Sequence, residues 1–141
     1  MTCGKKGWAL AAILALTACG PKNVEVGDTR IITILHISTK PAGWVTAYED
    51  SSFTFLEDHG TEERGDLSAS ELSALRAEVA NLQFREQSES DYVACEKSAD
   101  GYTFMRQGGT ICRETNSSAD SAEQDAVEFL AEFYREKSGA P

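Results

Sequence analysis

Four cysteines and two histidines are the residues of this chain best suited to nucleophilic, redox or metal chemistry. Cys3 and Cys19 stand in the first twenty residues, whereas Cys95 and Cys112 stand in the second half of the chain. A redox pair or a zinc site requires a close Cys-x-x-Cys spacing or histidines nearby. The chain has neither pattern, so the cysteines must serve another purpose.

The two histidines do not belong to a recognisable catalytic motif. His36 lies in the most apolar segment of the chain, where a packed histidine is more common than a metal ligand. Asp58, His59, Glu62 and Glu63 could be assembled into a cation site, but they lack EF-hand spacing and are typical of a solvated acidic loop. No Gly-x-Ser-x-Gly elbow, phosphate loop or dinucleotide fingerprint occurs. We therefore expect a protein that is not an enzyme and that has no cofactor or metal.

The start of the chain has the proportions of a secretory signal. Lys5 and Lys6 precede an uncharged apolar run, Trp8 to Leu16, which small residues connect to Cys19. The run is too short to cross a bilayer core of about 30 Å, which requires about 20 helical residues. The pattern predicts a signal peptide over residues 1–18.

The end of this signal, Leu16-Thr17-Ala18-Cys19, resembles the lipobox of bacterial lipoproteins. The resemblance implies that a diacylglyceryl group is attached to the sulfur of Cys19, that the chain is cut just before it, and that its new amine is acylated. Cys19 would then be the lipidation site and the contact with the membrane. Gly20 after the cysteine, rather than aspartate, implies the outer membrane. The alternative is an ordinary cleaved signal with a chance cysteine.

The charge of the remaining chain restricts its partners. Removal of residues 1–18 leaves 123 residues, with 11 basic and 23 acidic side chains and a net charge of −12. This length fits one small domain. Such a surface repels nucleic acid and anionic head groups, so we expect neither as a partner. It would favour a basic or metal-rich partner, and the alternative is an acidic surface that serves only solubility.

Cys95 and Cys112 are the only pair left after Cys3 and Cys19 are assigned to the signal and the lipid site. In an exported, oxidising compartment this predicts a structural disulfide. Closing a loop of 17 residues contributes about 3 kcal/mol in the chain-entropy model.

The pattern after Cys19 predicts a tether over residues 19–28 and a single domain over residues 29–138. The segment Arg30 to Thr39 is apolar at both parities and is typical of a strand inside a sheet. Further strands are expected at Trp44–Tyr48, Phe53–Glu57, Tyr92–Glu96, Tyr102–Arg106 and Thr110–Glu114. Residues 58–66 are polar, contain two glycines and read as a loop.

Two helices are expected. Ser68 and Glu71 have capping-box spacing, and an apolar stripe follows them. That stripe consists of Leu72, Leu75, Val79 and Leu82. The second helix should run from about Asp120 to Lys137 and end at Gly139. Its expected buried stripe consists of Ala122, Ala126, Phe129, Leu130 and Phe133.

Trp44 is the candidate for contact with a partner. Pro41 and Gly43 suit a tight reversal of the chain, because Pro41 has a restricted φ and Gly43 allows a positive φ. A tryptophan just after such a turn can anchor an interface. The alternative is that Trp44 folds back onto the core beneath Leu72 and Leu75.

The order of these elements resembles emfourin, a small bacterial inhibitor of thermolysin-type metalloproteases. The matching residues are Gly43-Trp44, Leu67-Ser68, Glu71-Leu72, Leu75 and Phe84. Emfourin-like sequences tend to carry Gly-Gly-Phe where this chain has Ala42-Gly43-Trp44. The resemblance implies a compact α+β domain that binds a protease.

The expected fold class is therefore α+β, a small and mainly antiparallel sheet of four to six strands with two helices packed on one face. The expected function is that of a periplasm-facing, outer-membrane lipoprotein that acts as a protein-binding module, with protease inhibition as a candidate activity. The alternative is a structural or envelope-maintenance lipoprotein with no discrete ligand. An exposed Trp44 favours the binding module, and a buried Trp44 favours the alternative.

Overall fold

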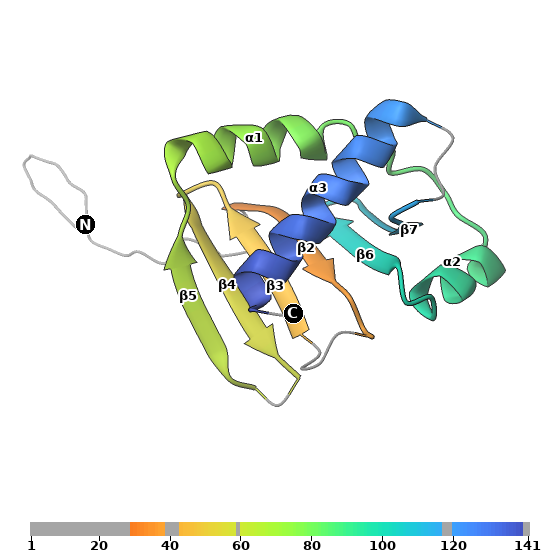
Figure 1. Ribbon diagram of the computed structural model, residues 1–141, viewed down its shortest axis with the longest axis horizontal. Helices are drawn as coiled ribbons and strands as arrows, with labels where there is room; N and C mark the ends of the chain where they lie inside the picture. The colour runs from red at the N-terminus through yellow and green to blue at the C-terminus, as the bar shows by residue number, and fades with distance from the viewer. Residues whose placement is uncertain (1–28, 39–42, 59, 117–119, 140–141) are drawn as a thin grey trace, which may run out of the picture.

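A computed structural model describes residues 29–38, 43–58, 60–116 and 120–139 (Figure 1). Six strands form one antiparallel sheet in the order β5-β4-β3-β2-β6-β7. The strands are β2 (Arg30–Leu35), β3 (Gly43–Tyr48), β4 (Ser52–Glu57), β5 (Glu62–Asp66), β6 (Gly101–Arg106) and β7 (Gly109–Glu114). The helices are α1 (Ala69–Val79), α2 (Glu89–Glu96) and α3 (Ser121–Ser138). The expected α+β class is confirmed, with one helix more than expected.

The most apolar strand occupies the interior of the sheet, as its sequence predicts. β2 pairs with β3 on one side and with β6 on the other. Ile32 and Ile34 are fully buried, and Thr33 between them is 6% exposed on the opposite face. The strand ends at Leu35, earlier than expected, because the chain turns at residues 37 and 38.

Helices α1 and α3 lie on the same face of the sheet, and α3 runs diagonally across the central strands (Figure 1). The strand side chains that meet these helices include Ile32, Ile34, Val45, Ala47, Phe55, Phe104 and Ile111. Leu75 of α1 and Leu130 of α3 are fully buried against them. This single apolar cluster is the core of the domain, and it attaches α1 and α3 to the sheet.

Local signals determine where the two long helices begin. The Ser68 hydroxyl accepts a hydrogen bond from the Glu71 N–H, and the Glu71 carboxylate accepts one from the Ser68 N–H, so the capping box is confirmed. Asp120 caps α3, and Gly139 ends it with a φ of 71°, a value that suits glycine. The buried face of α3 is wider than the expected stripe. Ala122 is exposed and Phe129 only partly buried, whereas Glu123, Val127, Ala131 and Tyr134 are buried beside the expected residues.

The segment Tyr92–Glu96, expected as a strand, belongs to helix α2. The Ser88 hydroxyl accepts a hydrogen bond from the Asp91 N–H and caps this helix. The aromatic and β-branched residues of the segment favour a strand by propensity, but α2 contributes only Cys95 to the buried set. Local capping together with the packing of α2 against β6 and β7 outweighs that propensity.

The expected loop over residues 58–66 contains strand β5, which pairs with β4. Four of its five residues are exposed, so it has no apolar alternation that could have revealed it. Its charged side chains suit an edge strand, because they discourage pairing with another chain. Gly65 lies beneath the Phe53 ring, where a Cβ would come within 2.5 Å of a ring carbon.

Candidate functional site

Cys19, the signal over residues 1–18 and the tether over residues 19–28 lie outside the described residues. The same is true of Pro41 and Ala42 in the expected turn before Trp44. The lipidation site and the turn therefore stay predictions from the sequence. The described residues contain no helix long and apolar enough to cross a membrane.

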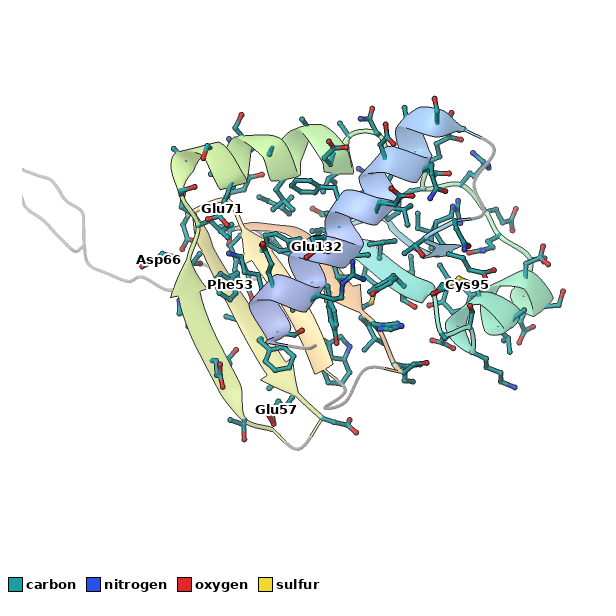
Figure 2. The ribbon with its side chains drawn as sticks, in the orientation of Figure 1. Phe53, Glu57, Asp66, Glu71, Cys95 and Glu132 are labelled. Atoms are coloured by element: carbon teal, nitrogen blue, oxygen red, sulfur yellow. A yellow bond between two sulfur atoms is a disulfide. The ribbon has the colours of Figure 1, made fainter. Side chains whose placement is uncertain are left out.

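The expected disulfide is present and attaches α2 to strand β7. The Cys95 and Cys112 sulfur atoms are 2.04 Å apart, and both residues are buried. Figure 2 shows Cys95 at α2, beside the outer strands. The Gln87 side chain donates to the Cys112 carbonyl and accepts from its N–H, each at 3.1 Å, so it satisfies the outer edge of β7. The bond is part of the framework that closes this end of the sheet.

Trp44 is the second residue of β3, and it lies on the face of the sheet opposite α1 and α3. Successive side chains of a strand point to opposite faces, and Val45 is fully buried in the core. Trp44 is therefore not packed beneath Leu72 and Leu75. Its side chain is half-buried among its strand neighbours.

Gly43 has a different role from the one its sequence suggests. Its φ is not positive, but a Cβ here would lie 2.7 Å from a ring carbon of Phe55 and 2.6 Å from the Leu56 carbonyl oxygen. The Gly43 carbonyl accepts a hydrogen bond of 3.0 Å from the buried Tyr134 hydroxyl of α3. Glycine is needed here for close packing, and that packing fixes the start of β3 and hence the position of Trp44.

Trp44 belongs to an apolar row that crosses three adjacent strands. Leu35 of β2 and Leu56 of β4 are its register partners, so all three side chains lie on one face. Leu56 is 38% exposed, and Leu35 is half-buried. We call Leu35, Trp44 and Leu56 the apolar row. The face that carries it is the open face, since α1 and α3 cover the other side of the sheet.

The apolar row is flanked on the open face by a row of threonines. Thr33, Thr46 and Thr54 are partners across the same three strands. The hydroxyls of Thr33 and Thr46 are 3.0 Å apart, and the Tyr48 hydroxyl lies 3.3 Å from that of Thr54. These hydroxyls satisfy one another, and Thr33 and Thr54 are buried, with 6% and 5% of their surface exposed. Of the two rows, solvent therefore reaches Thr46 and the apolar row, a largely apolar surface of the kind found at the centre of interfaces.

His36, just after β2, packs against β6 and the turn that precedes it. Its Nε2 lies 2.8 Å from the Ala99 carbonyl, and its ring stacks on Tyr102 with centroids 4.2 Å apart. Burial lowers the pKa of the imidazole below its usual value, so the neutral ring is favoured. The Tyr102 hydroxyl accepts a hydrogen bond from Arg135 at 2.9 Å. This network joins the end of β2 to β6 and α3.

One hollow was not anticipated from the sequence. A groove of about 490 Å³ runs between α1 and α3, on the helix-covered side of the sheet. The residues that line it are Ser70, Glu71, Ala74, Phe129, Glu132, Phe133 and Glu136. Phe129 and Phe133, like Glu132 and Glu136, are spaced by four residues and so repeat along one side of α3. These two spacings were the signal in the sequence that could have indicated the groove.

The candidate cation site at Asp58, His59, Glu62 and Glu63 does not form a single loop. Glu62 and Glu63 belong to β5, whereas His59 lies outside the described residues. Within the parts of the chain that the structure describes, no three His, Cys, Asp or Glu side chains gather closely enough to hold a metal ion. Comparisons of the chain with protein-family models, with curated proteins and with solved structures find no match.

Proposed function

We propose that this chain is an exported, lipid-anchored bacterial protein whose single domain binds another protein through the open face of its sheet. The observation that carries the proposal is the apolar row of Leu35, Trp44 and Leu56. A half-exposed tryptophan flanked by leucines is the composition of an interface anchor. The role is one of binding rather than catalysis.

The anchor is supported by two features of the chain. Leu16-Thr17-Ala18-Cys19 has the lipobox pattern, and Gly20 follows the cysteine. The disulfide between Cys95 and Cys112 suits an oxidising compartment outside the cytoplasm. Lipidation at Cys19 would hold the domain at the periplasmic side of the outer membrane, where it would meet other envelope proteins.

The class of partner to test first is a thermolysin-type metalloprotease, because the sequence resembles emfourin. The domain spanning residues 23–141 would be titrated against thermolysin while hydrolysis of a peptide substrate is followed. Inhibition by the wild-type domain, at least tenfold weaker for Trp44→Ala (about 1.4 kcal/mol), would support the proposal. Phe129→Ala is the matched control, since Phe129 is likewise a partly buried aromatic residue but lies on α3, on the helix-covered side of the sheet. Absence of inhibition would remove the protease as partner.

A structural or envelope-maintenance lipoprotein with no discrete ligand is the second candidate. It is favoured by the placement of Trp44 within a strand, where its neighbours cover part of the ring. A photo-crosslinking residue in place of Leu56 would separate the two candidates in living cells. One discrete adduct supports the binding module, whereas no adduct, with the protein present at its normal level, supports the structural role.

A further inference from the structure

The groove between α1 and α3 differs from the open face in both shape and charge. Glu71 on α1 and Glu132 on α3, both labelled in Figure 2, stand on its two walls. Its apolar lining residues, Ala74, Phe129 and Phe133, are partly or fully buried and make an apolar floor. Glu132 and Glu136 are exposed at the rim. Its volume of about 490 Å³ falls in the range of small-molecule sites.

Two residues that line the groove, Glu71 and Phe133, already contact an alkylammonium group of the chain itself. Lys137 Nζ lies 2.8 Å from a Glu71 carboxylate oxygen. It also lies 5.1 Å from the centroid of the Phe53 ring and 5.6 Å from that of Phe133. The Lys137 side chain is only 14% exposed. Carboxylate and aromatic faces together are therefore arranged to hold an amine on an aliphatic stem.

The rim of the groove on α3 carries two more carboxylates, and their negative charge is less neutralised than that of Glu71. Glu132 pairs with Arg135 at 2.7 Å, but Glu136 makes no ion pair with any described residue. The two glutamates are one helical turn apart, which is a rise of about 6 Å. Like charges at this spacing repel each other, and a cation between them removes that cost. Four methylene groups separate the two ammonium groups of a linear diamine by a similar distance.

We propose that the groove between α1 and α3 binds a linear aliphatic polyamine. One ammonium group pairs with Glu132 and the next with Glu136, while the methylene chain lies on Phe129, Phe133 and Ala74. The net charge of the chain, −10, attracts such a cation from solution. The groove and the open face lie on opposite sides of the sheet, so this proposal does not depend on the proposed function.

The test uses spermidine and putrescine as probes and the domain spanning residues 23–141, which contains every described element. Calorimetric titration in low-salt and physiological-salt buffer measures affinity, and amide NMR shifts locate the site. We expect shifts at residues 70–74 and 129–137. The double variant Glu132→Gln with Glu136→Gln should bind spermidine about tenfold more weakly.

The control variant changes the net charge by the same amount, but at glutamates outside the groove. Glu78→Gln with Glu86→Gln removes two exposed or half-exposed glutamates outside the groove and should leave spermidine affinity within about twofold. Thermal unfolding of both double variants shows whether they fold. Equal weakening by the two, or shifts scattered over the acidic surface and reproduced by Mg²⁺, would overturn the proposal in favour of unspecific counterion binding. A lysine-rich peptide that binds the groove where spermidine does not would also overturn it.

Discussion

Single residues join distant parts of this small domain. Glu123 is 2% exposed, and its carboxylate lies 3.5 Å from the Arg113 guanidinium and accepts from the Gln83 N–H at 2.8 Å. One side chain thereby connects α3, β7 and the segment after α1. Removing either partner of a buried ion pair leaves an uncompensated charge, so such residues tolerate replacement poorly. Gly43 and the disulfide also join distant segments, and we expect their replacement to lower the stability of the domain.

Replacing Gly43 should destabilise the domain without changing its surface. Gly43→Ala places a methyl group in contact with the Phe55 ring and the Leu56 carbonyl, and overpacking of this kind costs about 1–3 kcal/mol. Urea unfolding followed by circular dichroism measures the loss. Phe55→Leu combined with Gly43→Ala should recover part of it relative to Phe55→Leu alone. An unchanged midpoint for Gly43→Ala would contradict the close packing.

Loss of the disulfide should weaken the domain but not its fold. Cys95→Ser with Cys112→Ser should lower the free energy of unfolding by about 2–4 kcal/mol, because the denatured chain regains the freedom of the closed loop. Non-reducing peptide mapping should recover the two cysteines as one linked peptide pair in exported protein. Reduced wild-type protein is the control and should behave like the double variant. Two free thiols in exported protein would refute the bond.

At the scale of elements, the α1 and α3 helices are held together at opposite ends of their sequences. Lys137, near the end of α3, pairs with Glu71 in the first turn of α1. Glu71 also completes the capping box through the Ser68 N–H. The Lys137 hydrogen bond is the main cause, and the Ser68 hydrogen bond the second, of a Glu71 pKa below its usual value. The stability of the contact between the two helices therefore depends on pH.

Acid should weaken the contact between the two helices. Because the folded state lowers the pKa of Glu71, its contribution is complete above the unfolded-state pKa and is lost as the pH falls through the folded-state pKa. Glu71→Gln keeps a side chain that can complete the capping box but removes the charge. The variant should be less stable than wild type at neutral pH and equal to it below the folded-state pKa.

Urea-unfolding midpoints measured across that pH range test the effect. Glu78→Gln is the matched control, since Glu78 lies on the same helix and makes no ion pair with any described residue. It should show no comparable loss at neutral pH. A Glu71→Gln difference that persisted unchanged into acid would show that its charge is not the cause.

At the scale of the whole molecule, the two sides of the sheet carry different chemical groups. One side carries α1, α3, the core and the acidic groove, and the other presents the apolar row beside the threonines. Helix α2 bounds the open face near β7, because Cys112 shares a register row with Leu35 and Thr103 and its sulfur is bonded to α2.

Cys19 should decide where the molecule resides. Each buried methylene of an acyl chain contributes about 0.8 kcal/mol, and stable attachment needs more than one chain. Cys19→Ser should therefore shift the protein from the membrane to the aqueous fraction or leave it as an uncleaved precursor, as fractionation and mass spectrometry would show. Cys3→Ser is the control and should remain membrane-bound. A Cys19→Ser protein that was still cleaved and membrane-bound would disprove the lipoprotein assignment.

Features carried by neighbouring residues could be read from the sequence alone. The capping box of Ser68 and Glu71, the caps of α3 and the central position of β2 depend on short patterns of hydrogen-bonding or apolar side chains. The disulfide followed from elimination among four cysteines, given the export that the signal-like start of the chain predicts. Each of these signals lies within a few residues or in a simple count, so no tertiary contact was needed to detect it.

Tertiary structure alone decided the rest, because it depends on contacts between segments that are far apart in sequence. β5 has no apolar alternation and becomes a strand only by pairing with β4. α2 contributes one buried residue, so packing against β6 and β7 had to add to its local cap at Ser88 before the segment became a helix. The face chosen by Trp44 follows from the register of β3 with β2 and β4, and the groove follows from the crossing of α1 and α3. A pattern of residues limits which neighbours are possible, but only the assembled sheet and helices select among them.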